Sequence, residues 1–586
     1  MIRVVNKTIL GIMICFVSMK YSNFAPSINC TIHATMKKFI LPLLLVTCLI
    51  LLSGRNEREF TIYMIGDSTM ANKKLDGGNP ERGWGFVLPG FFSEKVAIEN
   101  HAQNGRSTKS FIDEGRWETV RNKIRKGDYV FIQFGHNDEK TDEKRHTDPG
   151  STFDDNLRKF VNETREKGGI PVLFNSIVRR NFVDGVLTDT HGEYREVPRR
   201  VAQELNVAFI DMNRLTHEWV ASLGDELSRQ YFMWVEPGKL ACCPDGKQDN
   251  THLNIKGAKM VAAIAVKELA TTAPALEPYI RHYDIVVAQD GSGDVFTIQE
   301  AINLVPDYSK GRETRILIRK GTYKEKLIVP PSKQYVSLIG QEGVVITGND
   351  YAKKKNAMGE PMGTSGSASC YIYGDDFYAE NITFSNTAGP VGQAVAALID
   401  SNRAIFYRCT FKGFQDTLYP YGKERDIRQY YKECHIEGSV DFIFGWATAY
   451  FDNCTIHSKA KGYIAAPATR QETSYGFVFN HCKLTADEAV EKVYLGRPWR
   501  EYGRAVYINC DMTAHIHPDG WRVWHNKKDH NTPFMGEYGS TGAGAKWQRV
   551  KWAKIITDPK KYTAAQVLTG NDKWDAQTVA EQKREK

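Results

Sequence analysis

The sequence has neither the residue spacings of a metal site nor the clusters of basic residues that mark a nucleic-acid-binding surface. Its 11 cysteines and 15 histidines form no CxxC motif and no paired-histidine spacing, so we expect no metal and no cofactor. Lysine and arginine give a formal net charge of +8, but they are spread along the chain. The net charge suits an acidic partner such as a polyanionic glycan, and the even spread argues against nucleic acid. A basic surface with no role in binding is the alternative that charge alone leaves open.

No apolar run is long enough to predict a stable membrane span in the mature protein. From Met36 the chain reads MKKFILPLLLVTCLILLSG, in which two lysines are followed by an apolar stretch and small residues. This order is typical of a secretory signal. We expect residues 1–55 to be a targeting segment, with Met36 as an alternative start, and the protein to be secreted or periplasmic. A lipid anchor at Cys48 is the less favoured alternative, because threonine precedes this cysteine.

The 586 residues exceed what one hydrophobic core usually supports, so two domains are expected. In the first half, short apolar runs alternate with amphipathic segments, which predicts a parallel sheet covered by helices. The expected strands are 61–65, 95–99, 129–134, 171–175 and 207–211, and the expected helices are 153–167, 194–205 and 255–270. Ligands of such sheets bind beyond the carboxyl ends of the strands.

Four polar motifs lie in this first half, and three of them follow expected strands. They are GDST (66–69), NGRS (104–107), FGHND (134–138) and DNTH (249–252). Ser68 follows the first strand, Gly105 the second and Asn137 the third. These residues should therefore meet at one edge of the sheet.

The four motifs together contain the groups that acyl transfer requires. A serine such as Ser68 needs a base, which His252 can supply, and Asp249 is close enough to fix the imidazole tautomer. The backbone amides of Ser68 and Gly105, with the Asn137 side chain, can donate to a tetrahedral oxyanion. Each motif alone is more often a turn, a loop or a helix cap. All four in this order favour a serine hydrolase.

GDSTMA, NGRSTKSF and QFGHND together resemble the SGNH (GDSL-type) hydrolases, and the rhamnogalacturonan acetylesterases in particular, over residues 61–270. The resemblance implies a three-layer, flavodoxin-like α/β domain without a metal. It also implies removal of acetyl groups from pectin by Ser68, His252 and Asp249, with Gly105 and Asn137 in the oxyanion hole. Another acetylated polymer, such as xylan, is the alternative substrate.

The segment ATTAPALEPYIRHY (270–283) contains two prolines and precedes a change to short, β-rich runs. We therefore predict a first domain at 56–272, a linker at 273–283, a second domain at 284–575 and a charged tail at 576–586.

The second domain contains an internal repeat. Asn381, Cys409, Cys434, Cys454, Cys482 and Cys510 align on one pattern at spacings of 28, 25, 20, 28 and 28 residues. Repetition at such periods predicts stacked coils of strands, that is, a parallel β-helix. The cysteines are interpreted as an inward-facing ladder of small apolar side chains. Disulfide bonds are the alternative, because an exported protein meets an oxidising environment.

The stretch GFQDTLY…RQYYKECHIEGSVDFIFG…YLGRPW closely resembles the pectin methylesterases (pectinesterases), from about residue 284 to 550. The resemblance implies a right-handed parallel β-helix that hydrolyses methyl esters with two carboxylates held in different states. It implies the following roles: Asp441 as nucleophile, Asp416 as acid and base, Arg497 as charge partner of Asp441, Gln393 and Gln415 as oxyanion donors, and Thr364, Tyr419, Phe444 and Trp499 as substrate contacts.

One stretch departs from this family pattern. Residues 465–470 read AAPATR where the family commonly has an AQGR-like stretch, which affects pocket shape and methylation-pattern preference rather than the reaction. The clustered aspartates and His-Gly pair of polygalacturonases are not seen.

The sequence therefore predicts a bifunctional esterase that acts on pectin as a monomer. A β-helix that only binds pectin is the alternative, and intact Gln415, Asp416, Asp441 and Arg497 argue against it.

Overall fold

The computed structural model describes residues 58–524, 531–546 and 548–585. The expected targeting segment at 1–55, including Cys48, lies outside the described residues. Within those three ranges, no helix combines the length and the apolar character needed to cross a membrane.

The first domain is built on a five-stranded parallel sheet in the order β2-β1-β3-β4-β7. The strands are β1 (Phe60–Gly66), β2 (Val96–Asn100), β3 (Tyr129–Gln133), β4 (Ile170–Phe174) and β7 (Ala208–Ile210). All five expected strands are present, and their order is the flavodoxin-like one. The chain reverses direction across the sheet between β1 and β3, where open α/β sheets bind their ligands.

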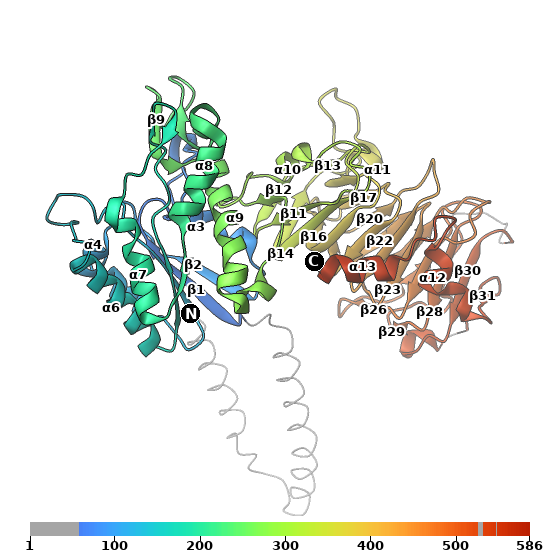
Figure 1. Ribbon diagram of the computed structural model, residues 1–586. Coiled ribbons are helices and arrows are strands. Elements are labelled where there is room, and N and C mark those ends of the chain that lie inside the picture. The colour runs from blue at the N-terminus through green and yellow to red at the C-terminus, as the bar shows by residue number, and fades with distance from the viewer. Residues whose placement is uncertain (1–57, 525–530, 547, 586) are drawn as a thin grey trace, which may run out of the picture. The chain divides into compact units, whose positions relative to one another are not determined.

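Helices cover both faces of this sheet (Figure 1), and alternate residues of the strands pack against the two layers. Met64 and Phe131 pack on one face, and Ile65 and Ile132 pack on the other. The first face is covered by α3 (Trp84–Val87), α8 (Met212–Ser228) and α9 (Ile255–Thr272); the second by α4 (Thr108–Asp113), α5 (Arg116–Arg121), α6 (Thr152–Glu166) and α7 (Val197–Leu205). The three-layer fold is confirmed, with α6, α7 and α9 at the three expected helices.

Two short antiparallel hairpins accompany this sheet. One pairs β5 (Phe182–Val183) with β6 (Val186–Leu187), and the other pairs β8 (Phe232–Val235) with β9 (Lys247–Leu253). Asn254 ends β9 and caps α9, because its side chain accepts hydrogen bonds from the amides of Lys256 and Gly257. The DNTH motif thus lies on a strand held against the start of a long helix.

The segment expected to be a linker packs against the first domain. Residues Pro274–Tyr279 form a short 3-10 helix, and Leu276 within it is completely buried in the core of that domain. The Ser93 amide donates to the Tyr279 carbonyl at 2.8 Å, and the Arg281 amide donates to the Phe91 carbonyl at 2.8 Å. The first domain therefore extends at least to residue 281.

A fragment of residues 58–272 is expected to be less stable than one of residues 58–283, by about 2–3 kcal/mol in the free energy of unfolding. The shorter fragment loses the buried Leu276 side chain and the contacts that follow it. Urea unfolding of the two fragments measures this difference. Leu276→Ala in the longer fragment should reproduce most of it. Equal stability of both fragments would show that the segment adds nothing to the first domain.

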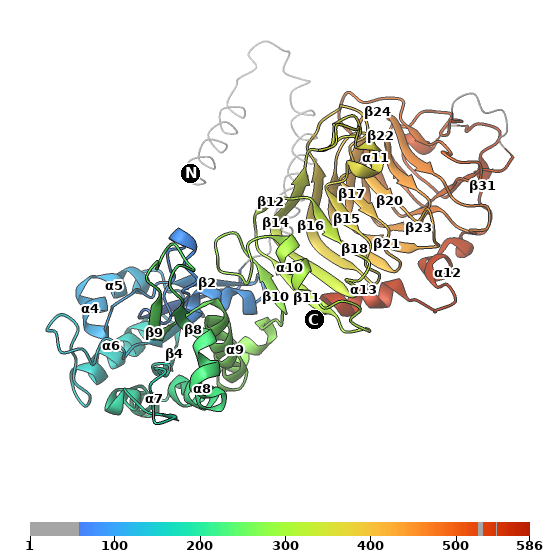
Figure 2. The same cartoon turned by 90° about the horizontal axis from the view of Figure 1, so that it is seen from above.

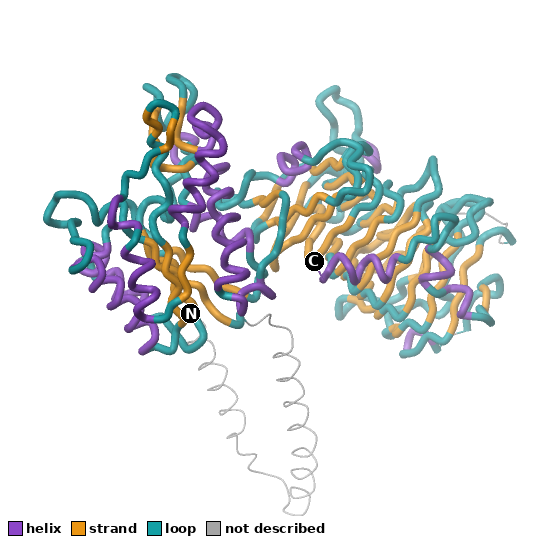
Figure 3. Tube along the Cα trace, in the orientation of Figure 1, coloured by secondary structure: helices purple, strands orange, loops and turns teal. Residues whose placement is uncertain are grey.

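The second domain is a parallel β-helix in which each coil contributes strands to three ladders (Figures 2 and 3). The first ladder runs through β10 (Ile285–Val287), β11 (Thr314–Ile318), β14 (Val336–Gly348), β16 (Tyr378–Asn386), β18 (Ala404–Tyr407), β21 (Arg428–Lys432), β23 (Thr448–Asp452), β25 (Phe477–Asn480), β28 (Arg504–Ile508), β30 (Phe534–Tyr538) and β31 (Lys554–Ile555).

The second ladder shares the long strands β14 and β16 with the first, and it shares β22 (His435–Gly445) and β24 (Thr455–Pro467) with the third. The second adds β12 (Thr322–Lys324), β19 (Thr410–Lys412), β22, β24, β26 (Lys483–Ala486) and β29 (Asp511–Met512). The third adds β13 (Leu327–Val329), β15 (Cys370–Ile372), β17 (Ala397–Ile399), β20 (Leu418–Pro420) and β27 (Tyr494–Gly496). The short helix α10 (Ile298–Leu304) covers the first coils, where it contacts β10 and β13.

The interior of the coil is filled by matched side chains from successive turns. Cys409, Cys434, Cys454, Cys482 and Cys510 are buried in the interior, as the ladder interpretation predicted, and their thiols are free. Beside them, Tyr431, Phe451, Phe479 and Tyr507 stack with ring centroids 4.8, 4.7 and 4.3 Å apart.

The first member of the predicted repeat was assigned one residue too early. Thr383 pairs with Thr410 and Phe384 with Phe411, so Ile382, not Asn381, occupies the position of Cys409. Asn381 instead adopts the left-handed conformation, with φ of 57°, of the residue before each cysteine. Asparagine tolerates that conformation, whereas the inward position requires an apolar side chain. The first spacing is therefore 27 residues rather than 28.

The segment expected to be a charged tail is a packed helix. Residues Ala576–Glu585 form α13, in which Ala576 and Ala580 are buried. Lys583 forms an ion pair of 2.7 Å with Glu313, beside the start of β11. Together with α12 (Ala564–Leu568), this helix covers outward-facing tyrosines of the first ladder.

Candidate active sites

The first site lies at the carboxyl end of β1, where the predicted serine, histidine and aspartate come together. His252 Nε2 is 2.9 Å from Ser68 Oγ, and His252 Nδ1 is 2.8 Å from Asp249 Oδ2. The other oxygen of Asp249 accepts hydrogen bonds from the amides of Thr251 and His252. Burial opposes ionisation of Asp249, but these bonds hold its pKa well below the ordinary value. The arrangement can activate the serine hydroxyl as a nucleophile.

The two predicted oxyanion residues lie on adjacent loops. Gly105 has φ of 75°, and the space that a side chain would occupy there is open. Asn137 is buried, and its Nδ2 donates to the Arg106 carbonyl at 3.1 Å, next to Gly105. The Asp138 carboxylate ties the loops together, because it accepts the amide of Thr108 at 2.9 Å and that of Gly135 at 3.1 Å.

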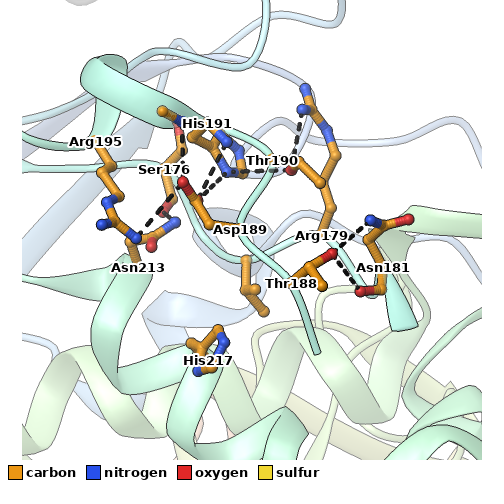
Figure 4. A network of polar contacts seen from close by, with 12 residues as sticks. Ser176, Arg179, Asn181, Thr188, Asp189, Thr190, His191, Arg195, Asn213 and His217 are labelled. Atoms are coloured by element: carbon orange, nitrogen blue, oxygen red, sulfur yellow. Dashed lines mark hydrogen bonds and ion pairs between the residues drawn. The ribbon is translucent and has the colours of Figure 1, made fainter. Parts of the chain in front are cut away.

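The other histidines near these motifs do not contact Ser68. Nδ1 of His136 lies 3.1 Å from Nε2 of His191, and both side chains are buried. Burial lowers the pKa of His136 well below its ordinary value and that of His191 to about 3, so both rings are neutral near pH 7. Figure 4 shows His191 beside Thr190, with Asp189 directed at both His191 and Arg195.

The second site lies on the β-helix, along one edge of the third ladder. Arg497 Nε donates to Asp441 Oδ1 at 2.9 Å, and one terminal nitrogen of the same guanidinium donates to Oδ2 at 2.7 Å. The predicted charge pair is thus a bidentate one, which orients the Asp441 carboxylate as well as neutralising it. Asp441 takes a left-handed backbone conformation, with φ of 50°, inside the long strand β22.

Two aromatic rings that the sequence analysis did not single out hold Arg497. The guanidinium carbon lies 4.0 Å from the ring centroid of Tyr463 and 4.0 Å from that of Trp524. Cation–π contacts on a planar guanidinium restrict its rotation. These rings come from β24 and from the segment after β29, so no local motif connects them with Arg497.

Asp416 lies one coil away from Asp441 and is almost completely buried. Burial, and then repulsion from Asp441, raise its pKa well above the ordinary value, although Arg497 acts in the opposite direction. The neighbouring Gln415 forms a parallel bridge with Gln393 of the preceding coil. The structure therefore brings together a buried carboxyl group with a raised pKa, an arginine-paired carboxylate and two glutamines on neighbouring coils. Such a set can supply an acid, a nucleophile and oxyanion donors.

Asp416→Asn is expected to raise the melting temperature more at pH 8 than at pH 4. Between the unfolded pKa near 3.8 and the raised folded value, the native chain binds the Asp416 proton more tightly. The free energy of unfolding therefore falls as the pH rises through this window, and asparagine removes that loss. Thermal unfolding of both proteins across this pH range provides the measurement. A stabilisation that does not change with pH would contradict the assignment of a buried, protonated carboxyl.

The predicted substrate contacts form an aromatic cluster beside these carboxyl groups. Tyr419 and Phe444 are buried and stack with centroids 3.9 Å apart. Their rings therefore expose little surface to a substrate and mainly support the site. Trp499 is half-buried, and its ring centroid lies 4.6 Å from that of Trp446. The sequence analysis did not identify Trp446. Thr364 lies in the short helix α11 (Gly363–Gly366), apart from these rings in sequence and partly exposed.

Two family descriptions match the chain, one over each of these sites. "GDSL-like Lipase/Acylhydrolase family" matches residues 64–260, and "Pectinesterase" matches residues 284–571. Pectinesterase QRT1 of Arabidopsis thaliana is 39% identical over 305 residues, which are 50% of this chain and 78% of the relative. Pectinesterase 31 of the same plant is 40% identical over 286 residues, which are 46% of this chain and 87% of the relative.

Solved structures also match the second domain. A pectin methylesterase from carrot shares 33% sequence identity with a TM-score of 0.47, over 51% of this chain and 96% of that one.

Together, the two sites and the two family matches define a carboxylic ester hydrolase with two hydrolase domains on one chain. The chain belongs to the pectinesterase family, and a GDSL-like acylhydrolase domain precedes its pectinesterase domain.

Proposed function

We propose that this chain removes two kinds of ester from one polymer: acetyl groups from pectin at the Ser68 site, and methyl groups from galacturonate at the Asp441 site. The observation that carries the proposal is the presence of two complete sites on one chain, one with a hydrogen-bonded triad and one with a bidentate Arg497–Asp441 pair. A family match over each domain supports the two reaction types.

At the first site, Ser68 Oγ attacks the acetyl carbonyl while His252 Nε2 takes its proton. The negative oxygen of the tetrahedral intermediate accepts hydrogen bonds from the amides of Ser68 and Gly105 and from Asn137. His252 then returns the proton to the departing sugar hydroxyl. Water, activated by the same imidazole, hydrolyses the acetyl-serine and releases acetate.

At the second site, an ionised oxygen of Asp441 attacks the methyl ester carbonyl of a galacturonate. Gln393 and Gln415 donate to the oxyanion, and Asp416 gives its proton to the departing methoxide, which leaves as methanol. The resulting anhydride is hydrolysed by water whose proton returns to Asp416. The raised pKa of Asp416 suits the first step, because the group must begin protonated.

The substrate of the first site is proposed to be rhamnogalacturonan-type pectin. The motif resemblance supports this choice, and so does the second domain, because tethering places one activity next to the polymer on which the other acts. Acetylated xylan is the competing substrate.

Acetate and methanol should be measured together on pectin that carries both esters, and acetate alone on acetylated xylan. Release of both products from pectin, with much faster acetate release from pectin than from xylan, is the expected result. Preferential release of acetate from xylan would reject the proposed substrate of the first domain.

We also propose that residues 1–55 direct export of the chain. Expression of the whole chain with its native start, followed by N-terminal sequencing of the secreted or periplasmic protein, tests it. A new N-terminus before residue 60 is the expected result. An uncleaved protein in the cytoplasm would reject it.

A further inference from the structure

A row of ion pairs begins at the carboxylate of the serine site and continues away from it. Lys247 Nζ lies 3.2 Å from Asp249 Oδ2, the oxygen that also receives the His252 ring. The same ammonium lies 3.1 Å from Glu81 Oε2, and Glu81 Oε1 lies 2.9 Å from Lys73 Nζ. Negative and positive groups therefore alternate from Asp249 to Lys73.

The row also reaches the oxyanion loop. Lys73 Nζ donates to the Asn104 side-chain oxygen at 2.7 Å, immediately before Gly105. Two parts of the serine site, the aspartate and the oxyanion loop, are thus connected through Lys247, Glu81 and Lys73. These three residues come from β9 and from the loop after β1, and none belongs to a motif of the sequence analysis.

Burial makes this row more than a set of surface ion pairs. The side chains of Lys73 and Glu81 are 3% and 15% exposed, and that of Lys247 is 35% exposed. Burial opposes the charge of each group, but the partners of Lys247, first Glu81 and then Asp249, raise its pKa. Burial likewise opposes ionisation of Glu81, but Lys73 holds its pKa below the ordinary value. Buried side chains such as these stay ionised only when an oppositely charged partner lies beside them.

The position of Lys247 weakens the stabilisation that Asp249 gives to the protonated His252 ring. In a Ser-His-Asp site the aspartate stabilises the imidazolium that forms in the transition state. An ammonium on the same aspartate oxygen competes for that negative charge. The other titratable groups whose fields reach the imidazole are Asp67, Glu81 and His136, of which Glu81 partly neutralises Lys247.

We propose that Lys247 is a positioning residue of the serine site, which fixes Asp249 and extends the activity of His252 as a base to lower pH, and that Glu81 limits this effect by pairing with Lys247. The inference rests on the proposed role of Ser68, His252 and Asp249. It predicts that removing the positive charge and removing the negative charge shift the pH profile in opposite directions.

The test measures hydrolysis of p-nitrophenyl acetate by the full chain carrying Asp441→Asn, so that the second site contributes nothing. In Lys247→Gln, the acidic limb of kcat/KM against pH should move up by about 0.5–1 unit. In Glu81→Gln it should move down. Activity near pH 5 should accordingly fall about three- to tenfold in the first variant and not in the second.

Several variants separate this effect from a loss of structure. Lys247→Arg keeps the charge and should leave the limb near its parent position. Lys256→Gln removes an exposed lysine at the start of α9 and should not move it. If Glu81→Gln unfolds because Lys73 loses its partner, Lys73→Met combined with Glu81→Gln restores the balance of buried charge. The limb should still move down in the double variant, but by less, because a positive charge is removed as well.

Shifts of the same sign in Lys247→Gln and Glu81→Gln, or no shift in either, would overturn the inference. Ser68→Ala in the same assay tests the underlying site. If that variant still hydrolyses the ester, the proposed triad is wrong, whatever the pH profiles show.

Discussion

Asp441→Asn is expected to reduce methanol release from methyl-esterified pectin by about a thousandfold or more, while acetate release stays near the parent value. An amide cannot form the acyl-enzyme intermediate, and the remaining oxyanion donors supply only part of the catalysis. Arg497, which contacts both oxygens of Asp441, keeps its aromatic neighbours Tyr463 and Trp524 in the variant. Initial rates of methanol and acetate release from one substrate measure both effects.

Two further variants support the interpretation of that result. Asp487→Asn changes an exposed aspartate of the same domain and should leave both rates unchanged. Arg497→Lys should give an intermediate loss of methanol release, because a lysine ammonium cannot make the bidentate contact. Parent-level methanol release in Asp441→Asn would mean that the second site is wrongly assigned.

Ser68→Ala should give the complementary result: acetate release falls by about 10⁴-fold or more, and methanol release is unchanged. The Ser68 hydroxyl contacts His252, so its removal should not disturb the remainder of the domain. The two products are again measured together, with circular dichroism to show that the variant is folded.

Ser222→Ala, which alters an exposed hydroxyl on α8, is the matched control and should keep both activities. Loss of methanol release in a folded Ser68→Ala variant would show that the two sites depend on each other.

The sequence predicted the parts of the fold that depend on local pattern. The ends of the strands before Ser68, Gly105 and Asn137 could be predicted, because buried parallel strands are short apolar runs bounded by polar loops. The helix α8 was not among the expected helices, and Asp211 falls at the end of the strand expected at 207–211. Asp211 also caps that helix by accepting the Arg214 amide, a signal that was present in the sequence.

Residues that depend on contacts between distant segments were not predictable in this way. Tyr463 and Trp524 meet Arg497 only because successive coils stack, and neither ring lies within a recognisable motif. Lys247 and Glu81 are 166 residues apart. A lysine two residues before Asp249 is unremarkable until β9 is placed against the loop that carries Glu81.

The packing of α13 has a consequence for the order in which the second domain can be completed during synthesis. The helices α12 and α13 cover outward-facing tyrosines of earlier coils, including Tyr378 and Tyr430, and Lys583 of α13 pairs with Glu313. Coils can form one after another as the chain emerges, because each coil contacts its neighbours. This apolar strip nevertheless stays uncovered until α12 and α13 have been synthesised. A ribosome stalled near residue 570 would therefore hold a nascent chain that contains the residues of both catalytic sites but still exposes an apolar surface prone to aggregation.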